Sequence, residues 1–296
     1  MIINSMCRGL MYLLYIPVIR NVCPDSWYVR CQYRYKMGKK LNLKDPRTFN
    51  EKIQWLKLND RDPVYTKMSD KCQARTFVSD RLGENYLIPL IGEYDDFDDI
   101  DFTKFPQQFV IKCSHDSGSV VIVKDKDTMD VDAVKKKICK ALRRNYFWIG
   151  REWAYKNIEP KIIVEKYLED ESGVELKDYK IFCFGGVPKF IQVDFDRFTN
   201  HRRNIYSPKW EYMAFTSMYP TDQDVHVPRP ENLDEMLSVA ETLSAGVPHV
   251  RVDLYSIGSD IKFGELTFYH GSGVEKYDPE EWDGTLGGWI DLDVKK

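Results

Sequence analysis

The sequence lacks the short motifs that mark several familiar enzyme classes. It has no G-x-x-x-x-G-K-[ST] phosphate loop, no G-x-G-x-x-G turn, no H-E-x-x-H zinc helix and no G-x-S-x-G nucleophile elbow. These absences remove support for P-loop nucleotide hydrolases, Rossmann-type dinucleotide-binding folds, zincin proteases and serine hydrolases. The five histidines are dispersed along the chain and predict no metal cluster.

Cysteine is present but is not organised. The seven cysteines are odd in number, scattered, and never spaced as Cys-x-x-Cys. A disulfide framework or a zinc site normally shows paired spacing, so the pattern argues against both and favours a reducing compartment. We therefore expect a cytoplasmic protein.

Neither charge nor hydrophobicity is extreme. The 43 Lys+Arg against 46 Asp+Glu give a net charge of −3, and 43% hydrophobic residues are enough for a core of one large or two ordinary domains. Because a dedicated nucleic-acid binder usually carries a basic excess, no nucleic-acid partner is expected. The longest apolar run, from Leu10 to Ile19, is interrupted by Pro17. As a helix it would span about 15 Å, roughly half a bilayer core, which excludes a membrane span.

The first forty residues differ from the rest in charge. They hold seven Lys/Arg and one acid, Asp25, which gives a local net charge of +6. With Leu13, Leu14 and Trp27, this segment can rest on an anionic surface at the inner face of the membrane. It can equally pack on its own acidic domain. Both interpretations stay open, and we expect no part for the segment in the chemistry.

The downstream pattern predicts antiparallel α+β sheets. Strand-like runs come in pairs around glycine turns and are separated by single helices, which argues against repeated βαβ units. Thr48 with Glu51, and Asn232 with Glu235, are spaced as helix caps. An acid-rich stretch, 92–101, is expected to be a solvated loop. The expected helices are 48–59, 70–82, 131–146 and 232–246, and the expected strands are 108–112, 119–123, 161–168, 178–184, 188–195, 249–255 and 261–268.

The strongest chemical signal lies near the C-terminus. Alternation places Arg251 and Asp253 on one strand face, and Glu265 and Thr267 on one face of the next strand. If the strands pair through a turn at Gly258, two carboxylates and a hydroxyl share a surface that suits Mg²⁺, and both carboxylates should face a solvent-filled cleft. The adjacent arginine can stabilise a transferring phosphoryl group. The alternative is a solvated strand face with a surface salt bridge.

A second signal is Lys112, at the end of an apolar strand and before the Ser/Gly-rich turn 113–118. Such a turn can surround a phosphate with backbone N–H groups and an ammonium. Lysines at strand ends are common, so this feature alone is weak.

Together these features resemble a family. The segments occur in the same order along the chain as in ATP-grasp proteins: Asp70-Lys71, the run 109–112 with its Ser/Gly loop, the run 163–168, Arg251-x-Asp253 and Glu265-x-Thr267. The closer similarity is to the teichuronopeptide-biosynthesis (TupA-like) ATP-grasp family of bacterial surface-polysaccharide clusters, through the runs 42–52, 178–184 and 265–273. The resemblance covers roughly residues 35–290.

The resemblance implies an α+β ATP-grasp fold, in which two subdomains with antiparallel sheets clasp ATP. A basic, helical N-terminal extension would cover residues 1–60 and the ATP-grasp domain residues 61–296. Within that domain, about 104–175 would form the central subdomain and 176–296 the C-terminal one.

The resemblance also implies the site residues. For ATP these are Lys71, Lys112, Ser114, Gly118, Glu165, Tyr167, Leu168, Asp178 and Lys180. The two lysines Lys71 and Lys112 would hold phosphates, Glu165 would read the adenine amino group, and Asp178 would hold the ribose. The Mg²⁺ ligands would be Asp253, Glu265 and Thr267, and Arg251 would be catalytic. The wider superfamily usually has asparagine at the position of Thr267, whose hydroxyl has less reach. The substrate-facing residues would be His201, Arg203, His270, Gly271 and Ser272.

The function implied is an ATP- and Mg²⁺-dependent, ADP-forming carboxylate–amine ligase acting through an acyl phosphate. Its substrate would be a small molecule or a polysaccharide, amidated on a uronic acid or given an amino acid during capsule or O-antigen biosynthesis. One alternative is a metal-dependent glycosyltransferase of the same pathway, and another is a nucleotide-binding scaffold without turnover. The Asp-x-Asp pairs that would serve the glycosyltransferase include Asp99/Asp101, Asp130/Asp132, Asp194/Asp196 and Asp291/Asp293.

Overall fold

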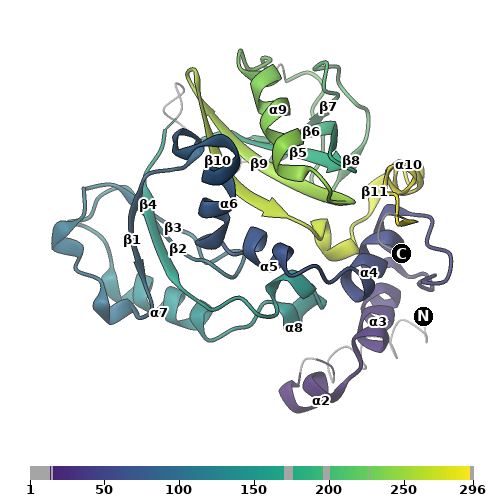
Figure 1. Cartoon of the computed structure of the whole chain (residues 1–296), viewed down its shortest axis with the longest axis horizontal. Coiled ribbons are helices and arrows are strands. Elements are labelled where there is room, and N and C mark those ends of the chain that lie inside the picture. Colours follow the sequence, from purple (N-terminus) through teal and green to yellow (C-terminus); the bar gives the residue numbers. More distant parts are fainter. Residues whose placement is uncertain (1–13, 15, 170–175, 196–200, 226, 294–296) are drawn as a thin grey trace.

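Two antiparallel sheets organise the computed structural model, which describes residues 14, 16–169, 176–195, 201–225 and 227–293 (Figure 1). The four-stranded sheet has the order β1-β4-β2-β3, with β1 Leu90–Tyr94, β2 Phe109–Cys113, β3 Val121–Val123 and β4 Ile162–Lys166. The five-stranded sheet has the order β10-β9-β5-β6-β7, with β5 Asp178–Phe184, β6 Val187–Phe195, β7 Arg202–Tyr206, β9 His249–Ile257 and β10 Asp260–Thr267. A small ladder pairs β8 Thr216–Ser217 with β11 Tyr277–Asp278.

The helices cover these sheets and connect them. Within the described residues they are α2 Pro17–Val22, α3 Asp25–Met37, α4 Phe49–Asn59, α5 Val64–Ser69, α6 Gln73–Leu82, α7 Val131–Leu142, α8 Phe147–Gly150, α9 Leu233–Ser244 and α10 Glu281–Trp289. Short 3-10 turns are η1 Glu84–Tyr86, η2 Phe97–Asp99, η3 Phe102–Lys104, η4 Trp153–Tyr155 and η5 His270–Gly273. Helix α7 packs on the four-stranded sheet and α9 on the five-stranded sheet, while α5 and α6 lie where the sheets approach each other (Figure 1).

Each sheet has its own hydrophobic core. The smaller core joins the four-stranded sheet to α7 through residues such as Phe109, Ile111 and Ile138. The larger core joins the five-stranded sheet to several helices, among them α4, which contributes Phe49 and Ile53. Helix α4 is thus part of this core, although it falls within the residues 1–60 expected as an extension.

Local sequence signals explain several helix boundaries. At α4 the predicted capping box is confirmed, because Thr48 and Glu51 each accept a hydrogen bond from the other's backbone N–H, both at 3.3 Å. At α9 the expected cap is wrong. The side chain of Asn232 makes no cap bond and instead accepts a hydrogen bond from the hydroxyl of Ser256 at 3.0 Å.

Three expected boundaries are also wrong. The helix expected over 70–82 begins only at Gln73, because the carboxylate of Asp70 accepts a bond from the backbone N–H of Cys72 and holds a turn. The helix expected to reach residue 146 ends at Leu142. The acid-rich stretch 92–101 includes the last part of β1, and Phe97 and Ile100 within it are buried, because its apolar residues face the core while its acids face outward. The four-stranded sheet therefore starts before residue 104.

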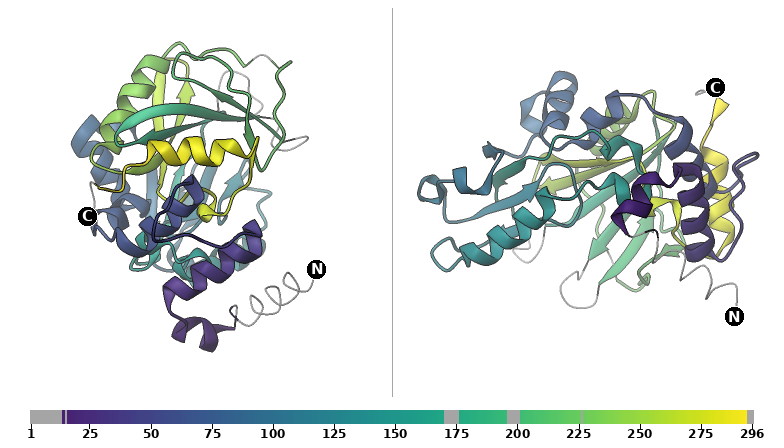
Figure 2. Two further views of the ribbon diagram at one scale, coloured as in Figure 1. Left: turned by 90° about the vertical axis from the view of Figure 1, so that its right-hand side faces the viewer. Right: turned by 90° about the horizontal axis from the view of Figure 1, so that it is seen from below.

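The N-terminal helices are attached to the body by α3. The hydroxyl of Tyr28 donates to the carbonyl of Ile149 at 2.9 Å, and the fully buried Arg151 lies 3.3 Å from the carboxylate of Asp25. Helix α2 has no buried residue, and Val18 and Val22 on it are 76% and 78% exposed. Figure 2 shows α2 and α3 at the periphery of the molecule. No helix within the described ranges combines the length and the apolar character needed to cross a bilayer.

Candidate functional site

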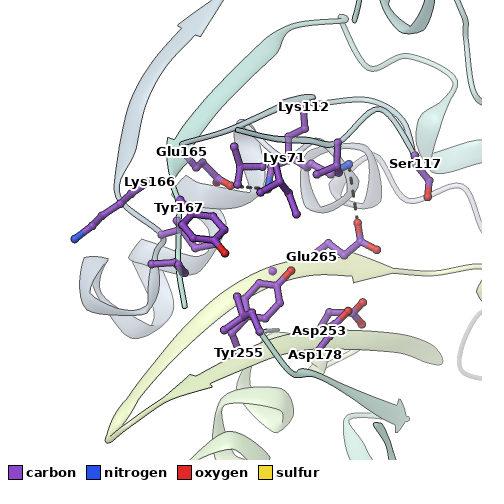
Figure 3. A pocket seen from close by; sticks show the side chains of 18 of the residues that line it. Lys71, Lys112, Ser117, Glu165, Lys166, Tyr167, Asp178, Asp253, Tyr255 and Glu265 are labelled. Carbon is purple, nitrogen blue, oxygen red and sulfur yellow. Dashed lines mark ion pairs between the residues drawn. The ribbon is translucent and has the colours of Figure 1, made fainter. Parts of the chain in front are cut away.

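A cavity of about 760 Å³ lies between the two sheets (Figure 3). Its walls come from β2, β3 and β4 on one side and from β5, β9 and β10 on the other. The lining residues that the sequence predicted are Lys71, Lys112, Gly118, Glu165, Tyr167, Leu168, Asp178, Asp253 and Glu265. Segments from distant parts of the sequence thus meet at one cleft.

Two lysines enter the cavity beside the four-stranded sheet. The ammonium of Lys71, in the turn before α6, donates to the carbonyl of Asp116 at 2.6 Å and lies 3.9 Å from the carboxylate of Glu265 across the cleft. The ammonium of Lys112 lies 2.5 Å from the carboxylate of Glu165. Both pairs are drawn in Figure 3. The lysine side chains are 12% and 13% exposed, so each can still meet a ligand in the cleft.

The same wall carries an apolar surface that stays partly exposed within the described chain. Val120 and Ile122 are 42% and 48% exposed, and both line the cavity. Other apolar lining residues are Ile88, Val110, Leu168 and Leu176. Exposed apolar side chains inside a concave site fit a flat, largely apolar ring.

The opposite wall holds the carboxylates. Strands β9 and β10 pair antiparallel with Asp253 opposite Glu265 and Arg251 opposite Thr267, so the pairing predicted through Gly258 is confirmed. The register shifts between Phe263 and Glu265. At this bulge a Cβ on Gly264 would lie 3.0 Å from the carbonyl of Asp253, which favours glycine where the two strands approach closely.

Arg251 organises these carboxylates. Its guanidinium donates two bonds of 2.6 Å to Asp253 and one of 3.3 Å to Glu265. Burial raises the pKa of Asp253 to about 6 despite the opposing charges of Arg251 and Lys180. Burial would also raise the pKa of Glu265, but the charges of Lys71 and Arg251 outweigh it and lower that pKa. Burial thus has the larger effect on the pKa of Asp253, whereas the neighbouring cations have the larger effect on the pKa of Glu265.

The expectation that both carboxylates face solvent is wrong for Asp253. Its side chain is 4% exposed because Arg251 and Lys180 lie against it, whereas the side chain of Glu265 is 36% exposed. The hydroxyl of Thr267 donates to Glu265 at 3.3 Å. Two carboxylates and a hydroxyl on paired strands are hard oxygen donors that fit Mg²⁺ when a ligand phosphate completes the set. In the described part of the chain, no three His, Cys, Asp or Glu side chains gather closely enough to hold a metal by themselves.

A network of charged side chains extends from this wall into the five-stranded sheet. Lys180 contacts Asp178, and its ammonium lies 3.7 Å from Asp194 and 3.8 Å from Asp253. Arg203 in turn donates to Asp194 at 2.7 Å. Lys180 does not line the cavity, but it links the ribose candidate Asp178 to the metal candidate Asp253.

The substrate candidates lie at the far side of this network. Arg203 is 3.7 Å from Glu275, which is 2.9 Å from Nε2 of His270. Nδ1 of His270 accepts a bond from Arg251 at 3.0 Å, and burial lowers the pKa of this imidazole, which is consistent with the neutral form. His201 stacks on Tyr219 with ring centroids 3.7 Å apart. Of these candidates His270 contacts Arg251 directly, and neither the candidates nor Arg251 itself lines the cavity.

The loop of Gly271 and Ser272 is held in a left-handed conformation, with φ of 56° and 54°. Ser272 is not a glycine, so this backbone is strained. Lys57 holds it, because its fully buried ammonium donates to the carbonyl of Ser272 at 2.6 Å and to the carbonyl of Gly150 at 2.8 Å. The loop thereby sets where His270 meets Arg251.

Some residues predicted for the site do not line the cavity, and some residues that line it were not predicted. Ser114 is buried behind the cavity, where its hydroxyl accepts a bond from the backbone N–H of Lys161 at 3.2 Å. The lining residues that were not predicted as ligands include Asp116, Ser117, Lys124, Lys166 and Tyr255. Strand alternation places Tyr255 on the face of Arg251, and the Ser/Gly turn contains Ser117, so both carried a signal. Asp116 lies in the same turn and Lys166 in the run 163–168, so they carried the same kind of signal, whereas Lys124 carried none.

A family model described as TupA-like ATP-grasp matches residues 51–291, most of the chain. No curated protein matches the sequence. Among solved structures, the D-alanine–D-alanine ligase from Bacillus anthracis complexed with ATP is 15% identical, with a TM-score of 0.38 over 68% of this chain and 54% of that one. The ATP-grasp ligase PsnB, complexed with a phosphomimetic variant of its minimal precursor, Mg and ADP, is 10% identical, with a TM-score of 0.43 over 80% and 61%. This chain thus spans less than two thirds of either one.

Proposed function

The chain belongs to the TupA-like ATP-grasp family, and from that premise we propose that it is an ADP-forming carboxylate–amine ligase. Its two α+β units with antiparallel sheets are the ATP-grasp fold expected from the sequence. One observation carries the proposal. A single cleft combines two lysines, a partly exposed apolar wall and the Asp253–Glu265 pair.

In this proposal, different parts of the ATP molecule contact the two sheets. The apolar wall of Val120 and Ile122 receives the adenine ring, and Glu165 accepts a hydrogen bond from its amino group. Lys71 and Lys112 hold phosphate oxygens, and Asp178 faces the ribose. The lysine ammonium groups are compact charges that suit phosphate.

Asp253, Glu265 and Thr267 would hold Mg²⁺. The ion would neutralise charge on the phosphates, which favours phosphoryl transfer. The other contributions to the reaction come from the protein's own side chains. Among them, Arg251 is held firmly by its two hydrogen bonds to Asp253.

Arg251 is the candidate for stabilising the transferring phosphoryl group. Asp253 and His270 fix its planar guanidinium, so little reorganisation is needed when charge develops on the phosphate. The γ-phosphoryl of ATP moves to a substrate carboxylate, which gives ADP and an acyl phosphate. Attack by an amine then forms the amide and releases phosphate. The protein contributes mainly position and charge.

The substrate proposal is a uronic acid or an amino acid in surface-polysaccharide biosynthesis, such as capsule or O-antigen. It is supported by the sequence runs that resemble the TupA-like family. We place the protein at the inner face of the membrane, because α2 exposes apolar side chains within a segment of net charge +6. The glycosyltransferase alternative has no support from the cavity. Of its Asp-x-Asp residues, Asp196 lies outside the described residues and none of the others lines the cleft.

The test has two stages. Thermal unfolding of the full chain with Mg-ATP or with a Mg-UDP-sugar should show stabilisation by ATP alone, because a ligand that binds the native state raises its stability. ADP release is then screened over pairs of uronic acids and amino acids. Stabilisation by the UDP-sugar alone would overturn the proposal. ATP binding without ADP release for any pair would favour a nucleotide-binding scaffold.

A further inference from the structure

Arg75 lies directly behind Glu165, although it does not line the cavity. It stands near the start of α6, on an element that the sequence assigns no role in base recognition. Its Nη1 donates to the carbonyl of Ile88 at 2.9 Å and lies 3.4 Å from Oε1 of Glu165. Arg75 therefore joins α6 to the segment before β1 and to β4.

Glu165 is consequently held between two cations. Lys112 lies 2.5 Å from Oε2, and Arg75 approaches Oε1 from the other side. The side chain of Glu165 is only 8% exposed. A carboxylate in this position needs such partners, because burying an unpaired charge is costly.

The two cations differ in what else they can do. Lys112 lines the cavity, so in the proposed function it also meets a phosphate. Arg75 does not line the cavity, and its other contact is a backbone carbonyl. When nucleotide draws Lys112 toward phosphate, Arg75 remains the cation that keeps Glu165 in place.

We propose that Arg75 is a positioning residue for base selection. By holding the side chain of Glu165 in one orientation, it makes the base pocket select purine nucleotides that carry an amino group at position 6. A carboxylate offers hydrogen-bond acceptors only, so it favours an amino donor and disfavours a carbonyl at the same position. This inference rests on the proposed function, because it assumes that a nucleotide occupies the cavity.

The experiment measures dissociation constants of the full chain for three Mg-nucleotides by calorimetry. ATP has the amino group, inosine triphosphate has a carbonyl, and purine riboside triphosphate has neither. We expect the wild type to prefer ATP over purine riboside triphosphate by about tenfold, the range of one hydrogen bond to a charged group. Arg75→Met should reduce that preference to about twofold, mainly through weaker ATP binding.

The matched control is Arg81→Met on the same helix, because among the described residues Arg81 donates only to the carbonyl of Phe77 and lies over its ring. It should keep the wild-type preference. Arg75→Lys retains a cation and should show an intermediate preference, and it replaces Arg75→Met in the test if that variant does not fold. Equal weakening of all three nucleotides by the Arg75 variants would mean a general structural role and would overturn the inference. Failure of the wild type to bind any of them would instead overturn the proposed function.

Discussion

Arg251 and Asp253 lie two positions apart on β9 and share two hydrogen bonds of 2.6 Å, one to each carboxylate oxygen. The same guanidinium lies 3.3 Å from Glu265 on β10. Glu265 is partly open to the cavity, whereas Asp253 is almost fully covered. Two carboxylates with one proposed role therefore differ in how much the fold depends on them.

Asp253→Asn should reduce both stability and turnover, whereas Glu265→Gln should reduce mainly turnover. Breaking a buried ion pair leaves the remaining charge uncompensated, which costs about 3–5 kcal/mol. A partly exposed pair contributes less than about 1 kcal/mol. Urea unfolding measures the first effect, and Mg-dependent ADP release against ATP affinity measures the second. Equal losses of stability in the two variants would contradict the difference in burial.

Lys112→Met should weaken ATP binding by at least about tenfold, because it removes a direct phosphate contact and one of two cations beside Glu165. Lys104→Met is the control, since Lys104 is an exposed lysine whose ion-pair partner in the described part of the chain is the nearby Asp101. It should bind ATP like the wild type. Calorimetry with Mg-ATP measures both, and unchanged affinity in Lys112→Met would remove this lysine from the site.

His249 should make the protein less stable in mild acid. Burial, with a smaller effect from His270, lowers the pKa of His249 from 6.5 to about 3. Between these two pH values the histidine is protonated in the unfolded chain but not in the folded chain. The free energy of unfolding therefore falls as the pH falls from 6.5 toward 3. At pH 5 the loss relative to pH 7 is about 2 kcal/mol.

The variant His249→Asn keeps a donor for the carbonyl of Cys183, which His249 contacts at 2.9 Å, but it does not titrate. Urea unfolding at pH 7 and pH 5 should show a smaller difference for this variant than for the wild type. Identical pH dependence in both proteins would mean that His249 does not carry the effect.

Two adjacent glycines of α10 should respond oppositely to alanine. A Cβ on Gly287 would lie 2.2 Å from the carbonyl oxygen of Arg47, so Gly287→Ala must displace backbone and should cost several kcal/mol. A Cβ on Gly288 meets nothing within 4 Å, and alanine is the better helix former by about 1 kcal/mol. Thermal unfolding measures both. A stabilised Gly287→Ala variant would show that the close approach of α10 is wrong.

The exposed end of α2 should bind anionic membranes. Val18→Asp with Val22→Asp places charge where the apolar side chains are most exposed, and should abolish co-sedimentation with vesicles of phosphatidylcholine and phosphatidylglycerol. Val187→Asp, at a 48% exposed position on β6, should leave it unchanged. Binding to phosphatidylcholine alone, or no binding by the wild type, would refute the membrane contact. Point substitutions are preferable to deleting the segment, because α3 supplies partners for the buried Arg151.

The carboxylate wall could be predicted because its information is local. Alternation along a strand assigns faces, and a glycine turn fixes which residues pair, so Arg251, Asp253, Glu265 and Thr267 follow from about twenty residues of sequence. Lys112 follows from the end of an apolar strand.

The contacts between distant segments could not be predicted in this way. Arg75 and Glu165 are 90 positions apart, on a helix and a strand that no shared pattern relates. Strand β1 could not be predicted, because acids surround its apolar residues. A run of acids indicates that one face of a segment is exposed to solvent, but it does not show that the other face is buried. Alternation also says nothing about what lies over a face, so the burial of Asp253 needed the fold.

The contacts of helix α4 affect when this part of the protein can fold during its synthesis on the ribosome. The backbone N–H of Asn50 donates to the carboxylate of Asp283, 233 positions later, and its side chain bonds to the carbonyl of Glu275, 225 positions later. At about 5–20 residues per second, these partners emerge roughly 10–50 s after Asn50 does. These contacts of α4 therefore form only after residue 283 has been synthesised, and a nascent chain stalled before Glu275 would present the polar groups of α4 to chaperones.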